Sequence, residues 1–97
     1  MFKPLNPLIH SPLRLSIMAF LVKVEKADFN QIKEVTQATN GNISIQIQKL
    51  KEADYITIEK SFKNNYPNTT CSITNKGIKE FNEYILSMKS YFNQKNK

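Results

Sequence analysis

Residues that build catalytic and metal sites are scarce in this sequence. Its 97 residues include one cysteine, one histidine and two glycines. One Cys and one His among scattered carboxylates form no ligand cluster at metal spacing, and no nucleophile has an evident base near it. Two glycines cannot supply a glycine-rich loop that cradles phosphates. We therefore expect no enzymatic activity, no metal and no cofactor.

Disulfides and long hydrophobic runs are absent as well. A single cysteine forms no internal disulfide, so the chain does not look like a secreted, disulfide-linked scaffold. The apolar run 15–22 is far too short to span a bilayer. The charged segment 23–26 follows it, where a signal peptide would have a small-residue cleavage site. We expect a cytoplasmic protein that does not contact a membrane.

Negative charge is scarce in the second half of the chain. Residues 60–97 hold seven basic side chains against two acidic ones, whereas residues 1–59 hold seven against six. The net charge of +6 favours a polyanionic partner such as nucleic acid, an acidic membrane or an acidic protein. Thirteen of the fourteen cations are Lys, which suits phosphate contacts but lacks the planar fork with which Arg reads guanine.

The length fits one domain, 1–97, which begins with a proline-containing arm at 1–10. Ser11 is a candidate cap for a first helix at about 12–24. This helix is apolar on nearly every side, as expected of a central helix that the rest of the domain covers. Thr39 is a candidate cap for a third helix at about 40–53.

The second helix is predicted from a capping box. Asp28 opens it, and Gln31 stands three residues later, where its side chain can reach back to the backbone of the first. Phe29, Ile32 and Val35, spaced by three, are expected to form its buried stripe. A polar turn then leads to the third helix.

Beyond the third helix the hydrophobic period changes from helix to strand and back. Alternating residues predict strands at 55–59 and 70–73, joined by a long polar tip at 60–68. Thr74 then caps a last helix at about 75–92, and 93–97 is expected to be a frayed tail. The domain core therefore spans 11–74.

The third helix is expected to have an inner and an outer face. At 100° per residue, Ile43, Ile47 and Leu50 fall in one narrow sector, which must face the core. The opposite sector and its edges carry mainly short, amide or basic side chains suited to base edges and phosphates. These outward residues, our candidates for reading bases, are Asn42, Ser44, Ile45, Gln48 and Lys49. Ile45 can meet a thymine methyl group, pack on the hairpin, or simply be exposed.

Helix, helix, tight turn, helix, hairpin and helix is the order of a winged helix-turn-helix. In that fold the third helix enters the DNA major groove and the hairpin reaches the backbone or the minor groove. Candidate backbone contacts are Thr39, Lys60, Lys63, Asn65, Tyr66, Asn68 and Lys76. Lone hairpin lysines are often merely solvated, and Tyr66 can equally be an exposed turn residue.

The last helix carries apolar residues at spacings of three and four, typical of a coiled-coil seam. The seam consists of Ile78, Phe81, Ile85, Met88 and Phe92. It can cover the protein's own core or pair with a second subunit. We favour pairing, with Leu8 and Ile9 of the arm contributing, and so expect a homodimer.

Short stretches along nearly the whole chain resemble a family of small bacterial winged-helix regulators related to the MarR and ArsR groups. They lie at 5–15, 27–29, 39–44, 49–56, 59–62, 67–70 and 73–77. The resemblance implies a three-helix core, a wing, a homodimer built from the terminal helices, and transcriptional control that is often repression. The resemblance does not indicate which small-molecule effector, if any, such a regulator would bind.

The chain departs from that family at positions that matter for DNA. Gln48 stands where a basic residue is expected, and the wing tip at 63–68 lacks arginine. Phosphate contacts are therefore expected either to be weaker, with a flatter salt dependence of binding, or to shift to Lys49, Lys60, Lys63 and Lys76. Cys71 replaces a common aromatic; on an alternating strand it is a small buried filler rather than an oxidation sensor.

The sequence thus predicts a homodimeric transcriptional regulator, a repressor, that binds double-stranded DNA. One alternative is a winged helix that binds another protein. Another is a regulator with a ligand pocket between the arm, the first helix and the partner's last helix, although no residue points to a particular small-molecule effector.

Overall fold

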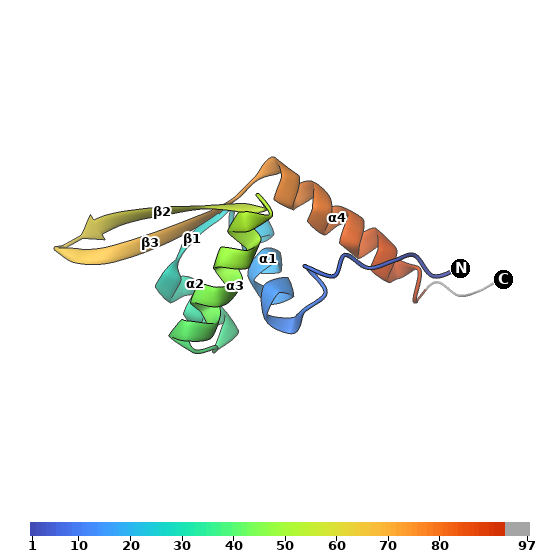
Figure 1. Ribbon diagram of the computed structural model, residues 1–97, viewed down its shortest axis with the longest axis horizontal. Helices are drawn as coiled ribbons and strands as arrows, with labels where there is room; N and C mark the ends of the chain where they lie inside the picture. Colours follow the sequence, from blue (N-terminus) through green and yellow to red (C-terminus); the bar gives the residue numbers. More distant parts are fainter. Residues whose placement is uncertain (93–97) are drawn as a thin grey trace.

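Within residues 1–92, which the computed structural model describes, four helices and a three-stranded antiparallel sheet form a winged helix-turn-helix (Figure 1). The mainly helical fold class with a hairpin wing is therefore confirmed. The predicted tail 93–97 lies outside the described residues. The elements are α1 Pro12–Val24, β1 Lys26–Asp28, α2 Phe29–Thr36, α3 Asn40–Glu52, β2 Ile56–Lys63, β3 Tyr66–Ile73 and α4 Asn75–Lys89.

Side-chain caps define the starts of three helices. Asp28 Oδ1 accepts from the backbone N–H of Gln31 at 2.8 Å, and Gln31 Oε1 accepts from the N–H of Asp28 at 2.9 Å, so the capping box is confirmed. Thr39 and Thr74 each accept from the N–H three residues later, at 3.2 and 2.9 Å. The expected Ser11 cap is wrong in one respect, because its side chain makes no capping hydrogen bond. A proline at the first helical position still pre-sets the backbone there.

The hairpin is longer than the sequence predicts. Its strands run to Lys63 and from Tyr66, and the connection is only Asn64 and Asn65, with φ of 53° and 67°. Two positive φ values in a two-residue connection describe a type I′ turn, which suits the twist of a hairpin and favours Asn. The predicted long tip was wrong because polar residues on both faces of a projecting strand look like a loop.

The sequence prediction also missed β1, the third strand. β3 lies in the middle of the sheet, with β2 on one side and β1 on the other. Ala27 of β1 is buried opposite Cys71 of β3. Three residues are too few to establish an alternating pattern, so the period of the sequence gives no signal for this strand.

The core surrounds α1, which contacts α2, α3, α4 and the sheet, as expected of a central helix. Its fully buried large side chains are Ile9, Ile17, Met18, Leu21, Ile32, Ile43, Leu50, Ile56 and Cys71. The predicted stripe of α2 is only partly right: Ile32 is buried and Phe29 packs against the core, but Val35 is 52% exposed. At 3.6 residues per turn, each step of three residues falls about 60° short of a full turn, so Val35 lies about 120° around α2 from Phe29 and faces away from the core.

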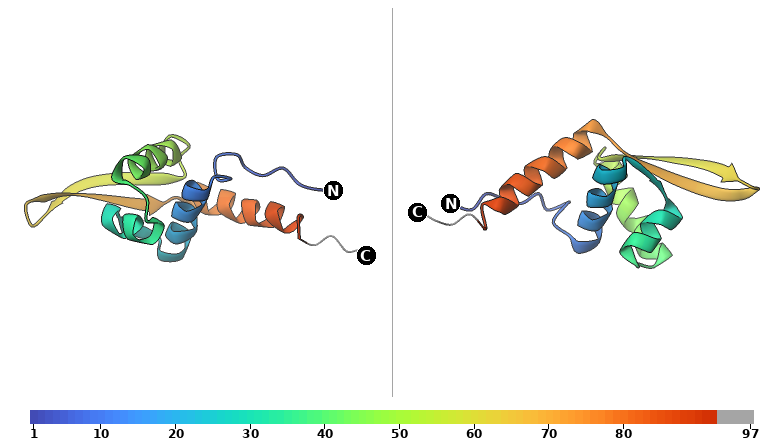
Figure 2. Two further views of the ribbon diagram at one scale, coloured as in Figure 1. Left: turned by 90° about the horizontal axis from the view of Figure 1, so that it is seen from below. Right: turned by 180° about the vertical axis from the view of Figure 1, so that it is seen from behind.

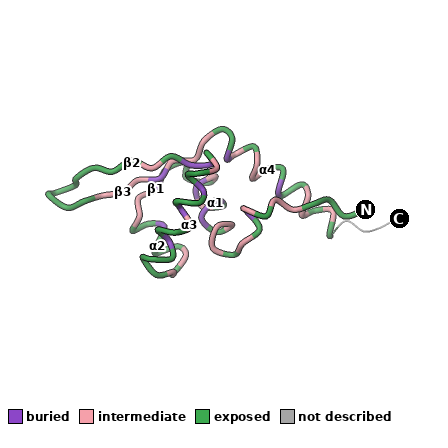
Figure 3. Tube along the Cα trace, in the orientation of Figure 1, coloured by how far each residue is buried: buried purple, intermediate pink, exposed green. Residues whose placement is uncertain are grey.

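The molecule is elongated, about 60 × 25 × 20 Å. The wing projects from one end, and α4 leaves the other end with the arm beside it (Figures 1 and 2). Phe2 stacks on Tyr91 at 4.7 Å between ring centroids, so the start of the arm contacts the turn that follows α4. Buried residues concentrate between these two projections, which are mostly exposed (Figure 3).

Candidate nucleic-acid interface

The outer face of α3 is open. Ile43, Ile47 and Leu50 are buried on its inner face, as predicted. All the side chains expected on the outer face are exposed, and Ile45 keeps 56% of its surface. These residues are Asn42, Ser44, Ile45, Gln48 and Lys49. Nothing in the described part of the chain covers this surface.

The two faces of the wing differ in what they present. Side chains alternate along a strand, so Lys60 and Phe62 lie on the same face of β2 as the buried Ile56. That face is turned toward the helices. Lys63 and its cross-strand neighbour Tyr66 are on the opposite face, beside the turn.

A hollow of about 150 Å³ lies between α3 and the root of the wing. Ser44 and Gln48 line it from α3, and Lys60 and Thr69 line it from the wing. Its apolar lining comes from Phe29, Ile47 and Ile58. We call this hollow the α3–wing groove. It brings two candidate base-reading residues and one candidate phosphate contact into a single concave surface.

Phe62 is a surface feature that the sequence prediction did not include among the site residues. It is 77% exposed and pairs across the hairpin with Pro67. A large exposed aromatic on the helix-facing side of the wing is able to contact whatever the α3–wing groove receives. Strand alternation continues from Ile56 and Ile58 through Lys60 to Phe62. It would have placed Phe62 on the helix-facing side of the wing if residues 60–68 had been predicted as strands and not as a loop.

Several candidate backbone contacts are spread around this surface. Thr39 lies exposed at the start of α3, Asn65 in the wing turn, and Asn68 half-buried on the outer wing face. Lys76 lies apart from them, in the first turn of α4, with its Nζ 5.8 Å from the centroid of the Tyr55 ring. That is the base of the hairpin, roughly 25 Å from its tip at the usual rise of a strand. The structure thus does not bring Lys76 together with the wing-tip residues.

The seam of α4 divides into two halves. Phe81 and Met88 pack against the subunit's own core. Ile85 is exposed, Phe92 is 72% exposed, and the adjacent Leu86 is 59% exposed. Both readings thus describe part of the seam: Phe81 and Met88 cover the core, Ile78 is half-buried, and Ile85 remains free. The predicted end of the last helix at 92 is wrong, because α4 ends at Lys89 and Phe92 lies in the turn after it.

The arm residues expected at a dimer contact also differ from each other. Ile9 is completely buried within its own subunit, so it has no surface to offer a partner. Leu8 is half-buried and packs against the same core. Tyr84, which the sequence prediction missed, is the buried α4 residue that receives the arm: its hydroxyl lies 2.8 Å from His10 Nδ1.

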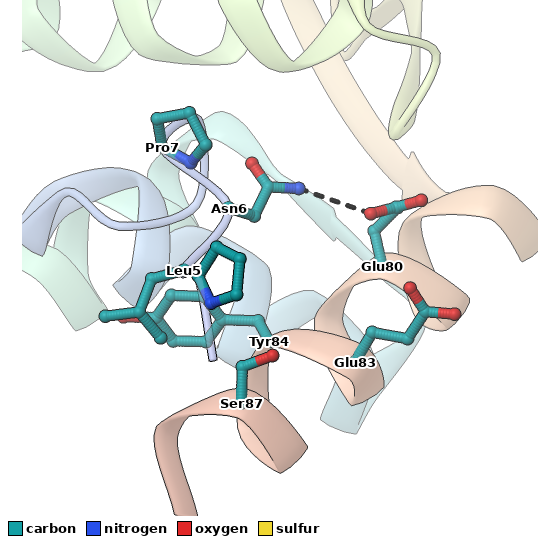
Figure 4. A pocket seen from close by; sticks show the side chains of 8 residues that line it. Leu5, Asn6, Pro7, Glu80, Glu83, Tyr84 and Ser87 are labelled. Atoms are coloured by element: carbon teal, nitrogen blue, oxygen red, sulfur yellow. Dashed lines mark hydrogen bonds between the residues drawn. The ribbon is translucent and has the colours of Figure 1, made fainter. Parts of the chain in front are cut away.

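Two hollows flank Tyr84. One, of about 280 Å³, lies between the arm and α4, where Asn6 Nδ2 donates to Glu80 Oε1 at 3.3 Å (Figure 4). The same nitrogen also donates to the Tyr55 hydroxyl at 2.8 Å. The other, of about 360 Å³, is mostly apolar and is lined by His10, Ser11, Pro12, Leu15, Tyr84 and Met88. The expected effector pocket used the last helix of the partner, whereas these two hollows lie against α4 of the same subunit.

Chemically reactive groups are few in residues 1–92. Burial raises the pKa of Cys71 to about 11, so its thiol is protonated at neutral pH and acts as a core filler. No group of three or more His, Cys, Asp or Glu side chains in this range is placed to hold a metal ion.

No helix in the described part of the chain has the length and hydropathy needed to cross a membrane.

Comparison with known proteins agrees with this arrangement. The chain is 35% identical to an uncharacterized protein of Methanocaldococcus jannaschii over 78 residues, which cover 80% of this chain and 85% of that protein. It superimposes with a TM-score of 0.83 on a transcriptional regulator homologue from Pyrococcus horikoshii OT3, at 31% identity over 90% of this chain and 86% of the other.

More distant structures share the fold. NadR in complex with 4-hydroxyphenylacetate matches with a TM-score of 0.72 at 13% identity, over 89% of this chain and 63% of NadR. An ArsR family transcriptional regulator matches with a TM-score of 0.58 at 10% identity, over 93% of this chain and 88% of the regulator. Residues 13–92 match the family model described as a winged helix DNA-binding domain. The chain belongs to this winged-helix DNA-binding family, whose fold it shares with transcriptional regulators.

Proposed function

We propose that the chain is a homodimeric transcriptional regulator that binds specific sequences of double-stranded DNA. In this proposal it acts as a single winged-helix domain in the cytoplasm and catalyses no reaction. The observation that carries the proposal is the open polar face of α3 beside the α3–wing groove. An α-helix about 10–12 Å across fits the major groove, which is about 12 Å wide. Lys60, on the opposite wall of the groove, then lies where a phosphate backbone passes.

The side chains divide into two roles by position. On the α3 face, hydroxyl and amide groups match the donors and acceptors of base edges, and the exposed Ile45 fits a thymine methyl. We assign base reading to Asn42, Ser44, Ile45, Gln48 and Lys49. We assign backbone contacts to Thr39, Lys60, Lys63, Asn65, Tyr66, Asn68 and Lys76, with Phe62 added from the structure.

The homodimer is supported by the position of the exposed apolar residues. Ile85, Leu86 and Phe92 lie on or just after α4, on the far side of the molecule from the wing. Pairing two subunits through this end covers these side chains and leaves both α3 faces open. The resemblance to repressing families, together with occupation of a duplex by two subunits, favours repression over activation.

Selection of bound duplexes from a random pool tests binding, specificity and symmetry together. We expect a pseudo-palindrome whose half-sites are one helical turn, roughly 34 Å, apart. Fluorescence anisotropy should then show tighter binding to the selected duplex than to a scrambled one, and weaker binding as salt rises. The proposal is refuted if no sequence is enriched and no duplex binds to micromolar protein at low salt.

The exposed Phe62 and a wing tip without arginine favour a second candidate, a module that binds another protein through its wing. The same anisotropy experiment separates the two candidates, because this one expects no duplex binding. A small-molecule effector in the hollows beside Tyr84 is compatible with either candidate. A thermal-shift screen of small ligands tests for it.

A further inference from the structure

The only arginine of the chain, the half-buried Arg14 of α1, directs its guanidinium toward α3. Arg14 Nε donates to the backbone carbonyl of Leu8 in the arm, and Arg14 Nη1 donates to Gln46 Oε1. Gln46 Nε2 in turn donates to Asn42 Oδ1 at 2.9 Å. A chain of hydrogen bonds therefore runs from the arm through α1 to an exposed residue in the first turn of α3. We call it the Arg14–Gln46–Asn42 relay.

The chemistry of the guanidinium gives the relay a direction. Arg has five donor hydrogens and no acceptor, so the atom of Gln46 that faces it must be the oxygen. The amide nitrogen of Gln46 then faces Asn42, and because that nitrogen only donates, it requires the Asn42 oxygen. Asn42 Oδ1 is thereby held by Gln46, whereas Nδ2 of this exposed side chain donates to no group within the described residues and remains available as a donor.

We propose that Arg14 and Gln46 are positioning residues that make Asn42 a hydrogen-bond donor to base edges. This inference rests on the proposed DNA-binding function. A donor fits the acceptors of guanine (O6 and N7) or thymine (O4) in the major groove. The bidentate contact to adenine, which is common for asparagine, needs the oxygen and the nitrogen of one amide together. The relay uses one lone pair of that oxygen and fixes the amide so that the oxygen points along the helix toward Gln46. This orientation disfavours the coplanar bidentate contact, so in our proposal Asn42 selects guanine or thymine at its position in each half-site.

Gln46→Glu tests the relay because it reverses its direction. A carboxylate only accepts, so it keeps the contact with Arg14 but forces Asn42 to turn and donate its Nδ2 inward. Asn42 Oδ1 then faces the duplex. The preferred base at one position of each half-site should change to adenine or cytosine, which present amino donors, by about tenfold in relative affinity. Positions read by Gln48 and Lys49 should keep their preference.

Matched variants separate this effect from the added charge. A new carboxylate weakens binding to all duplexes, so the measured quantity is the ratio of affinities for two duplexes that differ at one position. Gln46→Ala releases Asn42 to rotate and should flatten the preference at that position. In the double variant Asn42→Ala, Gln46→Glu the reversal should vanish. Melting curves check that each variant is folded.

A readout without DNA keeps the two proposals distinct. In ¹⁵N–¹H spectra, the side-chain NH₂ protons of Asn42 should exchange rapidly with water in the wild type and more slowly in Gln46→Glu, where they donate to the carboxylate. If the wild type selects a duplex but Gln46→Glu keeps its base preference, the relay is wrong and the DNA-binding function stands. If the exchange rates change as expected but no duplex binds, the relay orientation is supported and the proposed function fails.

Discussion

Side chains at the α3–wing groove are expected to contribute to DNA binding in different ways. Gln48 lies exposed on α3 and lines the groove, so it is placed to contact a base edge. Gln48→Ala should reduce discrimination between the selected duplex and a variant at one base pair by about 1–3 kcal/mol, with little loss on a random duplex. Competition anisotropy measures this difference. An equal loss on all sequences would place Gln48 on the backbone instead.

Lys60, across the groove, is expected to behave in the opposite way. It lies on the wing face turned toward α3, where a phosphate contact carries no sequence information. Lys60→Ala should weaken all duplexes alike and lower the slope of log K against log salt by about 0.9. Lys79→Ala removes an exposed lysine of α4, away from the groove, and is the matched control with an unchanged slope. A change in base preference with Lys60→Ala would contradict the assignment.

The buried thiol of Cys71 should make the free energy of unfolding depend on pH in the alkaline range. Burial raises its pKa from 9.0 to about 11, so the folded state holds the thiol proton more tightly than the unfolded state. The resulting stability is present below about pH 9 and is lost as pH rises toward 11, by roughly 2–3 kcal/mol. Urea unfolding across this range measures it. Cys71→Ala is less stable at neutral pH but should lose less stability between pH 9 and 11, because the titrating thiol is gone.

At the level of the elements, substituting the two glycines by alanine should change stability in opposite directions. A Cβ at Gly77 of α4 would lie 2.3 Å from the backbone oxygen of Tyr55, which already accepts from the N–H and hydroxyl of Thr74. Gly77→Ala should therefore cost about 1–3 kcal/mol of stability. A Cβ at Gly41 of α3 meets nothing within 4 Å. Gly41→Ala should be neutral or add up to about 1 kcal/mol, since alanine favours helix. Thermal and urea unfolding of the pair tests this contrast.

The helices that begin at a side-chain cap were predictable from the sequence, whereas the third strand and the length of the wing were not. Asp28, Thr39 and Thr74 mark helix starts that the structure confirms. β1 depends on a long-range pairing with β3, and the length of the wing depends on a turn of two asparagines. Neither feature produces a hydrophobic period, because one is too short and the other projects into solvent.

The same distinction applies to the candidate interface. The outer face of α3 follows from the helical period, because three buried apolar residues define where the opposite side lies. The Arg14–Gln46–Asn42 relay joins residues 32 positions apart, then four apart. No pattern in the chain predicts that contact, because only the packing of α1 against α3 creates it. The position of Phe62 on the wing likewise could be recognised only once the register of the hairpin was known.

At the scale of the whole molecule, the wing and α4 project in opposite directions from a small core. Domains of this size bury a limited fraction of their surface, so the free apolar end of α4 is costly to leave in water. The proposed dimer covers that end without using the α3–wing groove. Dimerisation and DNA binding are therefore expected to respond to different substitutions.

Leu86→Glu tests this separation because Leu86 is 59% exposed on α4 and lies outside the subunit core. A charge buried at a subunit contact is strongly unfavourable, so the variant should be monomeric in analytical ultracentrifugation. It should retain its melting behaviour as a folded chain and bind a single half-site with wild-type affinity. Binding to the full palindrome should fall by at least about tenfold, because the second half-site no longer gains from linkage to the first.

Val35→Glu is the matched control for the oligomeric state. Val35 is similarly exposed but lies on α2, away from the free end of α4. It should leave the sedimentation of the protein unchanged. A Leu86→Glu variant that remains dimeric would show that the subunits meet elsewhere. If instead the wild type is itself monomeric yet binds the palindrome, each half-site is occupied independently, and the spacing between half-sites should then have no effect on affinity.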